Sequence, residues 1–204
     1  MELWKAINEK LQMGDTANVI IAGITCSGKT TLANRIREEY QSRYTTAIIS
    51  QDDYFKNLPD IPRVREGYLT DSIQAFHTDE FRQDVKQLLG TGIAIMPQYD
   101  ISTNTRVAKN KVTRWGRINV FEGLHTISLL GSMNGCIKVF VDTNMDTCLS
   151  RRIARDTVKF SIPKERIVQY WNECIQPMCK MYILPQKQKA NIIITHQGDE
   201  DNAN

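Results

Sequence analysis

Short apolar stretches rich in β-branched and aromatic residues recur along the chain and predict buried strands. They cover residues 19–22, 47–50, 117–121, 137–141 and 192–195. Patterns typical of amphipathic helices stand between them, and this alternation is characteristic of a parallel sheet wound with helices. We therefore predict an α/β fold with a mostly parallel sheet flanked by helices.

The helices are predicted from periodic apolar positions and from residues that favour helix ends. Leu32, Ile36 and Tyr40 recur every fourth residue after Lys29 and indicate one amphipathic helix. Three further helices are predicted from end signals. The first begins with Thr78 as N-cap and ends at Gly90. The second begins with Thr143 and Asp146 as a capping box. The last opens at Ser161 and Pro163 and is expected to kink at Pro177.

Regions 53–77 and 92–115 interrupt the alternation of strands and helices. The first is long and mixed, with prolines and charges, and is expected to be a loop-rich surface excursion. The second is predicted to be an inserted hairpin with arms 93–98 and 106–115. Because loops often carry binding residues, we expect substrate contacts in both regions. The polar tail 197–204 is expected to be frayed.

Length and charge limit the classes of protein that fit. The 204 residues suit a single domain, 1–204. The formal net charge is only +3, from 26 basic and 23 acidic side chains, and no long block of like charges occurs. We therefore expect no nucleic-acid partner.

Cysteine content and hydropathy indicate the compartment. The five cysteines are odd in number and form no Cys-x-x-Cys pair, so neither a disulfide framework nor a zinc site is expected. The N-terminus lacks the pattern of a secretory leader, and no apolar run is long enough to span a membrane. A cytoplasmic protein without membrane contact is the expectation.

The segment Gly23-Ile24-Thr25-Cys26-Ser27-Gly28-Lys29-Thr30 has the spacing of a phosphate-binding loop between a strand and a helix. Its glycines permit close backbone approach, and the helix N-terminus receives phosphate oxygens. Lys29 can neutralise the terminal phosphates, and the Thr30 hydroxyl can ligate Mg²⁺. The loop predicts a bound nucleoside triphosphate.

Acidic residues follow the strands predicted next to this loop. Asp52 and Asp53 come after strand 47–50, and Glu122 follows the strand that ends at Phe121. Ligands bind at the carboxyl ends of parallel strands, so one aspartate can act as a base and Glu122 can lie beside a metal ion.

Arg151, Arg152 and Arg155 form a basic row on the helix predicted after Thr143. Helical spacing puts Arg151 and Arg155 on one face, where planar guanidinium groups could clamp phosphates. A solvated basic face paired with Asp146 or Asp156 is the alternative.

With these motifs in view, the chain resembles the uridine kinase and phosphoribulokinase group of P-loop kinases, over about residues 19–198. The resemblance rests on the phosphate loop and on segments 49–55, 71–76, 99–106, 121–124 and 141–156. It implies a P-loop kinase fold with a substrate hairpin at about 92–115 and an arginine-bearing lid at about 151–165. It also implies ATP and Mg²⁺ as cofactors, and self-association of the chain.

The resemblance further assigns roles to individual residues. Asp52 is implied to be the general base, with Lys29 and Arg155 as further catalytic residues. Thr30, Asp52 and Glu122 are implied around Mg²⁺. ATP contacts are implied for Gly23, Thr25, Cys26, Ser27, Gly28, Lys29, Thr30, Thr31 and Arg151. Substrate contacts are implied for Asp52, Phe55, Asp71, Tyr99, Arg106, Arg152 and Gln169.

The identity of the phosphate acceptor stays open because the departures from the family pattern fall on its pocket. Asn104 stands where uridine kinases usually carry a histidine, and the lid stretch 156–163 lacks their usual Arg-Gly-Arg. The expected activity is ATP-dependent phosphorylation of a small molecule, foremost a nucleoside such as uridine or cytidine. A phosphorylated sugar, nicotinamide riboside or pantothenate is the alternative acceptor, and a regulatory NTPase is the alternative function.

Overall fold

The computed structural model describes residues 2–65 and 67–196, so the predicted frayed tail lies outside the described residues. Its centre is a sheet of parallel strands in the order β2 (Thr46–Ser50), β7 (Ile118–Gly123), β1 (Ala17–Gly23), β8 (Ile137–Thr143) and β9 (Ile192–His196). The predicted strands and the predicted fold class are confirmed.

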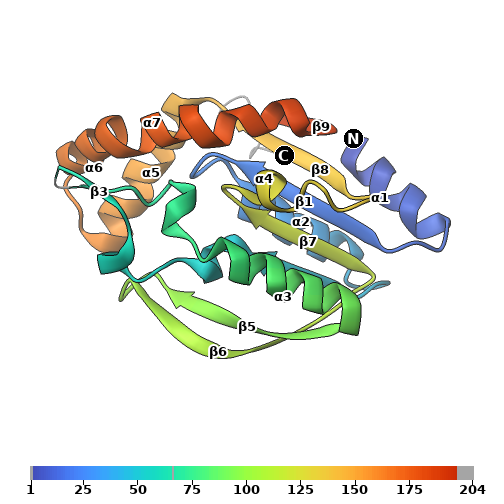
Figure 1. Ribbon diagram of the computed structural model, residues 1–204. Helices are drawn as coiled ribbons and strands as arrows, with labels where there is room; N and C mark the ends of the chain where they lie inside the picture. Colours follow the sequence, from blue (N-terminus) through green and yellow to red (C-terminus); the bar gives the residue numbers. More distant parts are fainter. Residues whose placement is uncertain (1, 66, 197–204) are drawn as a thin grey trace.

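Helices cover both faces of this sheet (Figure 1). One apolar core joins the sheet to α1 (Glu2–Gln12) and α2 (Lys29–Tyr40), and the other joins it to α3 (Thr78–Thr91) and α4 (Thr126–Leu130). Alternate residues of β1 enter the two cores, because successive side chains of a strand point to opposite faces. No helix in the described part of the chain has the length and apolar content that a membrane span requires.

The inserted hairpin is confirmed as the antiparallel pair β5 (Ile93–Asp100) and β6 (Thr105–Arg114). Its register shifts between Met96 and Gln98, at the proline that cannot donate a ladder hydrogen bond. Asn104 closes the turn with a φ of +52°. Figure 1 shows the hairpin and α3 together on one side of the central sheet.

Short elements make up most of the excursion that was predicted to be rich in loops. Single 3₁₀ turns, η1 (Gln51–Tyr54), η2 (Leu58–Asp60) and η3 (Ile73–Ala75), alternate with a small antiparallel pair, β3 (Arg63–Val64) and β4 (Gly67–Tyr68). These elements lie at the end of the molecule where the hairpin turns back, and where α5 (Met145–Phe160) and α6 (Lys164–Tyr170) are also found (Figure 1).

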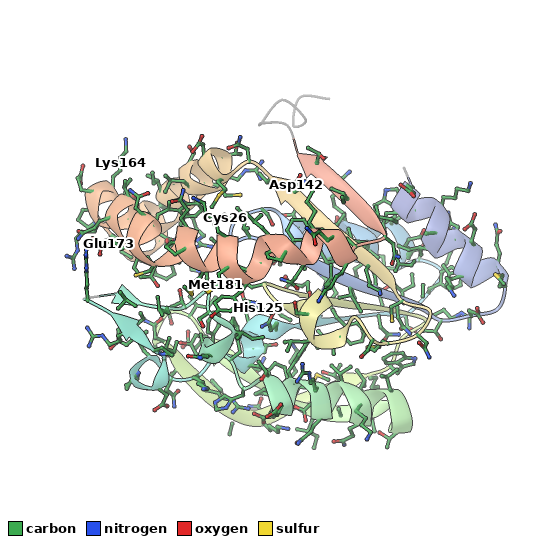
Figure 2. The ribbon with its side chains drawn as sticks, turned by 45° about the horizontal axis from the view of Figure 1, so that its top comes forward. Cys26, His125, Asp142, Lys164, Glu173 and Met181 are labelled. Carbon is green, nitrogen blue, oxygen red and sulfur yellow. The ribbon has the colours of Figure 1, made fainter. Side chains whose placement is uncertain are left out.

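Residues 145–189 form a long helical run between β8 and β9. After α5 (Met145–Phe160) come α6 (Lys164–Tyr170), a π-helical turn η4 (Trp171–Ile175), α7 (Gln176–Met178), a second π-helical turn η5 (Cys179–Ile183) and the 3₁₀ segment η6 (Leu184–Lys189). The irregularity predicted at Pro177 thus takes the form of π-helical turns on either side of a residue that has no N–H to donate. Figure 2 shows Lys164, Glu173 and Met181 spread along this run.

Several predicted helix ends are corrected by the structure. Thr78 is the first residue of α3 and does not cap it. The helix passes Gly90 and ends at Thr91, with Gly92 as its C-cap, where the φ of +74° suits glycine. Asn144, not Thr143, caps α5, because its Oδ1 accepts a hydrogen bond from the Asp146 N–H at 2.8 Å.

Thr143 and Ser161 have other tasks than those predicted. The Thr143 hydroxyl donates to the main-chain oxygen of Ser27 at 2.9 Å and so ties β8 to the phosphate loop. Ser161 ends α5 with a φ of +54°, and α6 opens directly after Pro163. Helices α1 and α4 were not predicted.

Candidate active site

The phosphate loop joins β1 to α2 and has left-handed backbone conformations at two positions. Cys26 has a φ of +59° and Gly28 a φ of +100°, and Gly28 lies directly before the first helical residue, Lys29. The Lys29 ammonium donates to the main-chain oxygen of Ile24 at 2.8 Å, across the loop. The Ser27 hydroxyl is buried and has no hydrogen-bond partner, which leaves a donor ready for a ligand atom or water.

Glu122 connects three segments at the carboxyl edge of the sheet. Its Oε1 accepts a hydrogen bond from the Ser50 hydroxyl at 2.6 Å, and its Oε2 accepts one from the Thr30 hydroxyl at 3.3 Å. Because β7 lies between β2 and β1, the ends of the three strands meet at this point. Glu122 lies within β7, which ends at Gly123, whereas the sequence predicted that Glu122 follows the strand.

These oxygen atoms fit a magnesium ion. Mg²⁺ prefers hard oxygen ligands, and it usually takes one or two protein groups together with phosphate oxygens and water. The Thr30 hydroxyl and the Glu122 carboxylate are such groups, and they lie 3.3 Å apart beside the phosphate loop. In the described part of the chain no cluster of three or more His, Cys, Asp or Glu forms a complete metal cage.

Asp52 lies in the turn η1, two residues beyond the end of β2. Burial raises the pKa of Asp52 to about 7, and the negative charge of Glu122 adds to this effect while Lys29 opposes it. A carboxyl group with this pKa can exchange a proton near neutral pH, which is the property that a general base needs.

The arginine row of α5 contacts both the phosphate loop and an acidic partner. Arg152 Nη1 donates to the Thr25 hydroxyl at 3.3 Å, and Arg152 Nε lies 3.2 Å from Asp156 Oδ2. Arg155 Nε donates to the other oxygen of Asp156 at 2.7 Å. The alternative of an ion-paired face is thus realised for Arg152 and Arg155, but Asp156 is buried at the cleft and the pairing holds both guanidinium groups there.

Asp71 is a further buried carboxylate that lines the same cleft. It is 3% exposed, its Oδ1 accepts a hydrogen bond from the Thr70 hydroxyl at 3.3 Å, and its Oδ2 has no partner. Burial raises the pKa of Asp71 although Arg152 lies near. A buried oxygen without a partner beside a cleft is suited to accept a hydrogen bond from a substrate hydroxyl.

His125, at the start of α4 (Figure 2), supports the main chain of Asp71. Burial lowers the pKa of His125 to about 4, so the ring is neutral at physiological pH. Its Nε2 lies 2.9 Å from the Asp71 main-chain oxygen, and since a carbonyl can only accept, Nε2 carries the proton. The main-chain N–H of His125 donates a second hydrogen bond, to the side-chain Oε1 of Gln51 at 2.8 Å.

One cleft of about 1,210 Å³ brings most of the candidate residues together. The candidates that line it are Thr25, Cys26, Gly28, Lys29, Thr30, Thr31, Asp52, Phe55, Asp71, Tyr99, Glu122, Arg151, Arg152 and Arg155. Gly23 lies behind the loop, where a Cβ would approach the Val141 carbonyl to 2.7 Å. Phe55 and Tyr99 form an aromatic wall with ring centroids 5.3 Å apart.

Arg106 and Gln169 do not line the cleft. Arg106 Nη2 donates to Glu80 at 2.6 Å, which holds the guanidinium against α3. Gln169 is exposed on α6 and its amide donates to Glu173 at 3.2 Å, one helical turn away. The next residue, Tyr170, points inward to the Thr70 hydroxyl at 2.8 Å, so helical rotation turns Gln169 outward.

Other cleft residues were missed by the sequence analysis. Leu58 and Ile61 of the excursion line the cleft, and so does Ile101 of the hairpin turn. Phe160, at the end of α5, and Ile162, between α5 and α6, also line it. The sequence did carry a signal for these residues, because each is an apolar side chain in a segment that is otherwise polar. A surface loop has no core of its own, so such side chains indicate a binding surface.

Comparison with known proteins agrees with this geometry. A model of the phosphoribulokinase/uridine kinase family matches residues 19–203. The uridine kinase of Lactobacillus johnsonii is 34% identical over 186 residues, which covers 89% of this chain and 87% of that protein. The uridine kinase of Deinococcus deserti is also 34% identical, over 87% of this chain and 86% of that protein.

The fold has a counterpart among solved structures. Phosphoribulokinase from Rhodobacter spheroides superposes with a TM-score of 0.57 at 15% identity, over 89% of this chain and 71% of that one. At this low identity the superposition shows only that the two proteins share a fold. Membership of the family follows from the family model and from the two uridine kinases. The chain therefore belongs to the phosphoribulokinase/uridine kinase family and is an ATP-dependent small-molecule kinase.

Proposed function

We propose that this protein transfers the γ-phosphoryl group of ATP, with Mg²⁺, to a hydroxyl group of a nucleoside such as uridine or cytidine. The observation that carries the proposal is that one cleft is lined by the phosphate loop, by Asp52 and by the buried Asp71. The sequence likeness to proteins named uridine kinases supports it.

Asp52 is the proposed general base. Its carboxylate would accept the proton of the attacking hydroxyl, and its pKa of about 7 leaves a large ionised fraction at neutral pH. Lys29 and Arg155 are the proposed electrophilic groups, since cations near the transferred phosphoryl group stabilise the charge that develops on its oxygens. On binding ATP, Lys29 would exchange the Ile24 main-chain oxygen for phosphate oxygens, and Arg155 would likewise exchange Asp156.

Thr30 and Glu122 are the proposed residues that hold Mg²⁺, directly or through water. When bound, the ion neutralises phosphate charge and orients the phosphate chain. Ser50, which donates to Glu122 at 2.6 Å, would fix the orientation of this carboxylate.

A neutral acceptor fits the hairpin wall better than a phosphorylated one. Three basic side chains of β6 are already paired with carboxylates at 2.6 to 2.9 Å, and so they offer little charge to an acceptor phosphate. These pairs are Arg106 with Glu80, Lys109 with Asp84, and Lys111 with Asp53. The free oxygen of Asp71 repels anions and accepts hydrogen bonds from hydroxyl groups, which favours a ribose over a sugar phosphate or the carboxylate of pantothenate.

We further propose a cytoplasmic location and a small-molecule rather than a nucleic-acid partner. All five cysteines are free thiols, which suits a reducing compartment. The net charge of +3 gives no strong attraction to nucleic acid.

The deciding experiment incubates the protein with Mg·ATP and measures ADP release with uridine, cytidine, nicotinamide riboside, ribulose 5-phosphate or pantothenate as the acceptor. We expect release that depends on a nucleoside. Equal release without any acceptor would favour the regulatory NTPase, and release with the sugar phosphate alone would overturn the nucleoside assignment.

A further inference from the structure

A second groove, of about 780 Å³, shares no lining residue with the nucleotide cleft. It lies between α3, the segment 127–133 that contains the end of α4, the start of β8 and the end of η6. We call it the basic groove. Its floor is apolar and includes the buried side chains of Val85, Ile127, Leu129 and Leu130. Leu89 is 44% exposed beside this floor and adds apolar surface that a ligand can reach.

Among the described residues, those that line the rim of the basic groove include four cations and no carboxylate. Arg82 and Lys86 come from α3, Lys138 from β8, and Lys189 from the end of η6. Arg82 has a long ion pair with the exposed Asp79, at 3.7 Å. In the described part of the chain, the three lysines have no ion pair. Exposed cations without partners attract an anion from solution.

The positive charge of the groove results from a segregation of charges on α3. Glu80 and Asp84 face the hairpin, where Lys109 lies within 3.2 Å of both carboxylates. Arg82 and Lys86 face the groove, on a stripe with Val85 and Leu89 at the spacing i, i+3, i+4 and i+7. Glu80 and Asp84 are thus neutralised at the hairpin, and Asp79 is the acidic residue of α3 that stays paired with a groove cation, Arg82.

Arg82 also gives the groove a fixed shape. Its Nε donates to the main-chain oxygen of Leu129 at 3.3 Å and so joins α3 to α4 across the floor. A guanidinium held in this way can still offer its terminal N–H groups to a phosphate, for which its planar fork is suited.

We propose that the basic groove binds a small organic anion of the phosphate-ester class that carries a flat apolar group. The rim cations recognise the phosphate, and the floor of Val85, Leu89 and Ile127 covers the apolar group. The volume lies within the range of about 300 to 1,000 Å³ that is typical of small-molecule sites. This site is separate from the proposed kinase reaction and does not depend on the identity of the phosphate acceptor.

The test uses 1-naphthyl phosphate, followed by its intrinsic fluorescence, with the full chain and with the nucleotide cleft saturated by Mg²⁺ and a non-hydrolysable ATP analogue. Inorganic phosphate and 1-naphthol are measured by calorimetry as the two halves of the probe. We expect the intact ester to bind at least tenfold more tightly than either half, with an affinity that falls as salt is added.

Two variants localise the binding. Lys86→Ala combined with Lys138→Ala removes two rim cations and is expected to weaken the ester about tenfold or more. Lys5→Ala combined with Lys180→Ala removes two exposed lysines elsewhere and is the matched control, with no expected change. Leu89→Ser should weaken the ester but leave inorganic phosphate unchanged.

The proposal fails if the ester binds no more tightly than inorganic phosphate, if both lysine pairs have the same effect, or if the ATP analogue abolishes binding. The last result would place the probe in the nucleotide cleft. Because the readout is binding and not turnover, failure here leaves the kinase proposal untouched, and failure of the kinase proposal leaves this one standing.

Discussion

The Ser50 hydroxyl donates to Glu122 Oε1 at 2.6 Å and thereby joins the carboxyl ends of β2 and β7. Asp52 follows Ser50 by two residues, so the proposed base and the proposed magnesium carboxylate belong to one hydrogen-bonded unit. The charge of Glu122 also helps to raise the pKa of Asp52. The proposed chemistry of both residues therefore depends on this contact between neighbouring strands.

Asp52→Asn should abolish most phosphoryl transfer and keep ATP binding. The amide is close to isosteric with the carboxylate but cannot take a proton, and loss of a general base typically costs about 10² to 10⁴ in rate. Single-turnover rates measure the chemical step, and calorimetry with the ATP analogue measures binding. A variant that keeps more than about a third of the wild-type rate would remove Asp52 from the role of base.

The acceptor kcat/KM should rise with pH and level off above about pH 7. The pKa of Asp52 is raised to about 7, so below this value the carboxyl is protonated and cannot act as a base. We expect about a tenfold loss per pH unit in the acidic limb, measured at constant ionic strength with saturating Mg·ATP. A flat profile between pH 5 and pH 8 would contradict the assignment.

The same pKa shift predicts that Asp52→Asn is more stable than the wild type. A folded-state pKa of about 7, above the ordinary value of about 4, means that the wild type loses stability as pH rises from about 4 to about 7. The variant does not titrate at this position, so its advantage should grow over that range and reach roughly 1 to 3 kcal/mol at pH 8. Urea unfolding of the ligand-free proteins at pH 5 and pH 8 measures the difference. Equal stability at both values would show that the charge is well solvated.

Glu122→Gln should raise the Mg²⁺ concentration that gives half-maximal activity by about tenfold or more, because the amide carries no charge for the ion. It should also move the acidic limb of the pH profile to lower pH, since a negative charge that raises the pKa of Asp52 is removed. Ser50→Ala keeps both carboxylates but removes the hydrogen bond that orients Glu122, so its effect on the Mg²⁺ requirement should have the same direction and be smaller. An unchanged magnesium requirement in Glu122→Gln would remove this residue from the metal site.

Patterns with a local physical cause could be predicted from the sequence. The buried strands follow from runs such as Val19 to Ala22, which must be covered on both faces, and the phosphate loop follows from glycines and Lys29 at fixed spacing. Strand ends on a parallel sheet then bring Asp52 and Glu122 together. Helix ends were less predictable, because Thr143 had a tertiary partner in Ser27 and Asn144 took the cap.

Features that depend on rotation or on distant pairing could not be predicted. The outward direction of Gln169 follows from the exact phase of α6, and the engagement of Arg106 follows from the approach of the hairpin to Glu80. The π-helical turns around Pro177 have no local signal in propensity, since the same residues also suit an ordinary helix. The basic groove likewise arises only when α3, α4 and β8 pack together.

Gly123→Ala should destabilise the protein and disturb the site, whereas Gly90→Ala should stabilise it. A Cβ on Gly123 would meet the Gln51 Cβ at 2.4 Å and its Oε1 at 2.6 Å, and Gln51 is fully buried beside Asp52. Overpacking of this kind costs about 1 to 3 kcal/mol. Gly90 lies exposed in α3 with nothing within 4 Å of an added Cβ, so alanine should gain about 0.5 to 1 kcal/mol through its helix propensity. Urea unfolding of both variants gives the signs, and the acceptor kcat/KM should fall in Gly123→Ala alone, because the displaced Gln51 shifts the turn that carries the proposed base. Stability changes of the same sign in the two variants would contradict this packing at the end of β7.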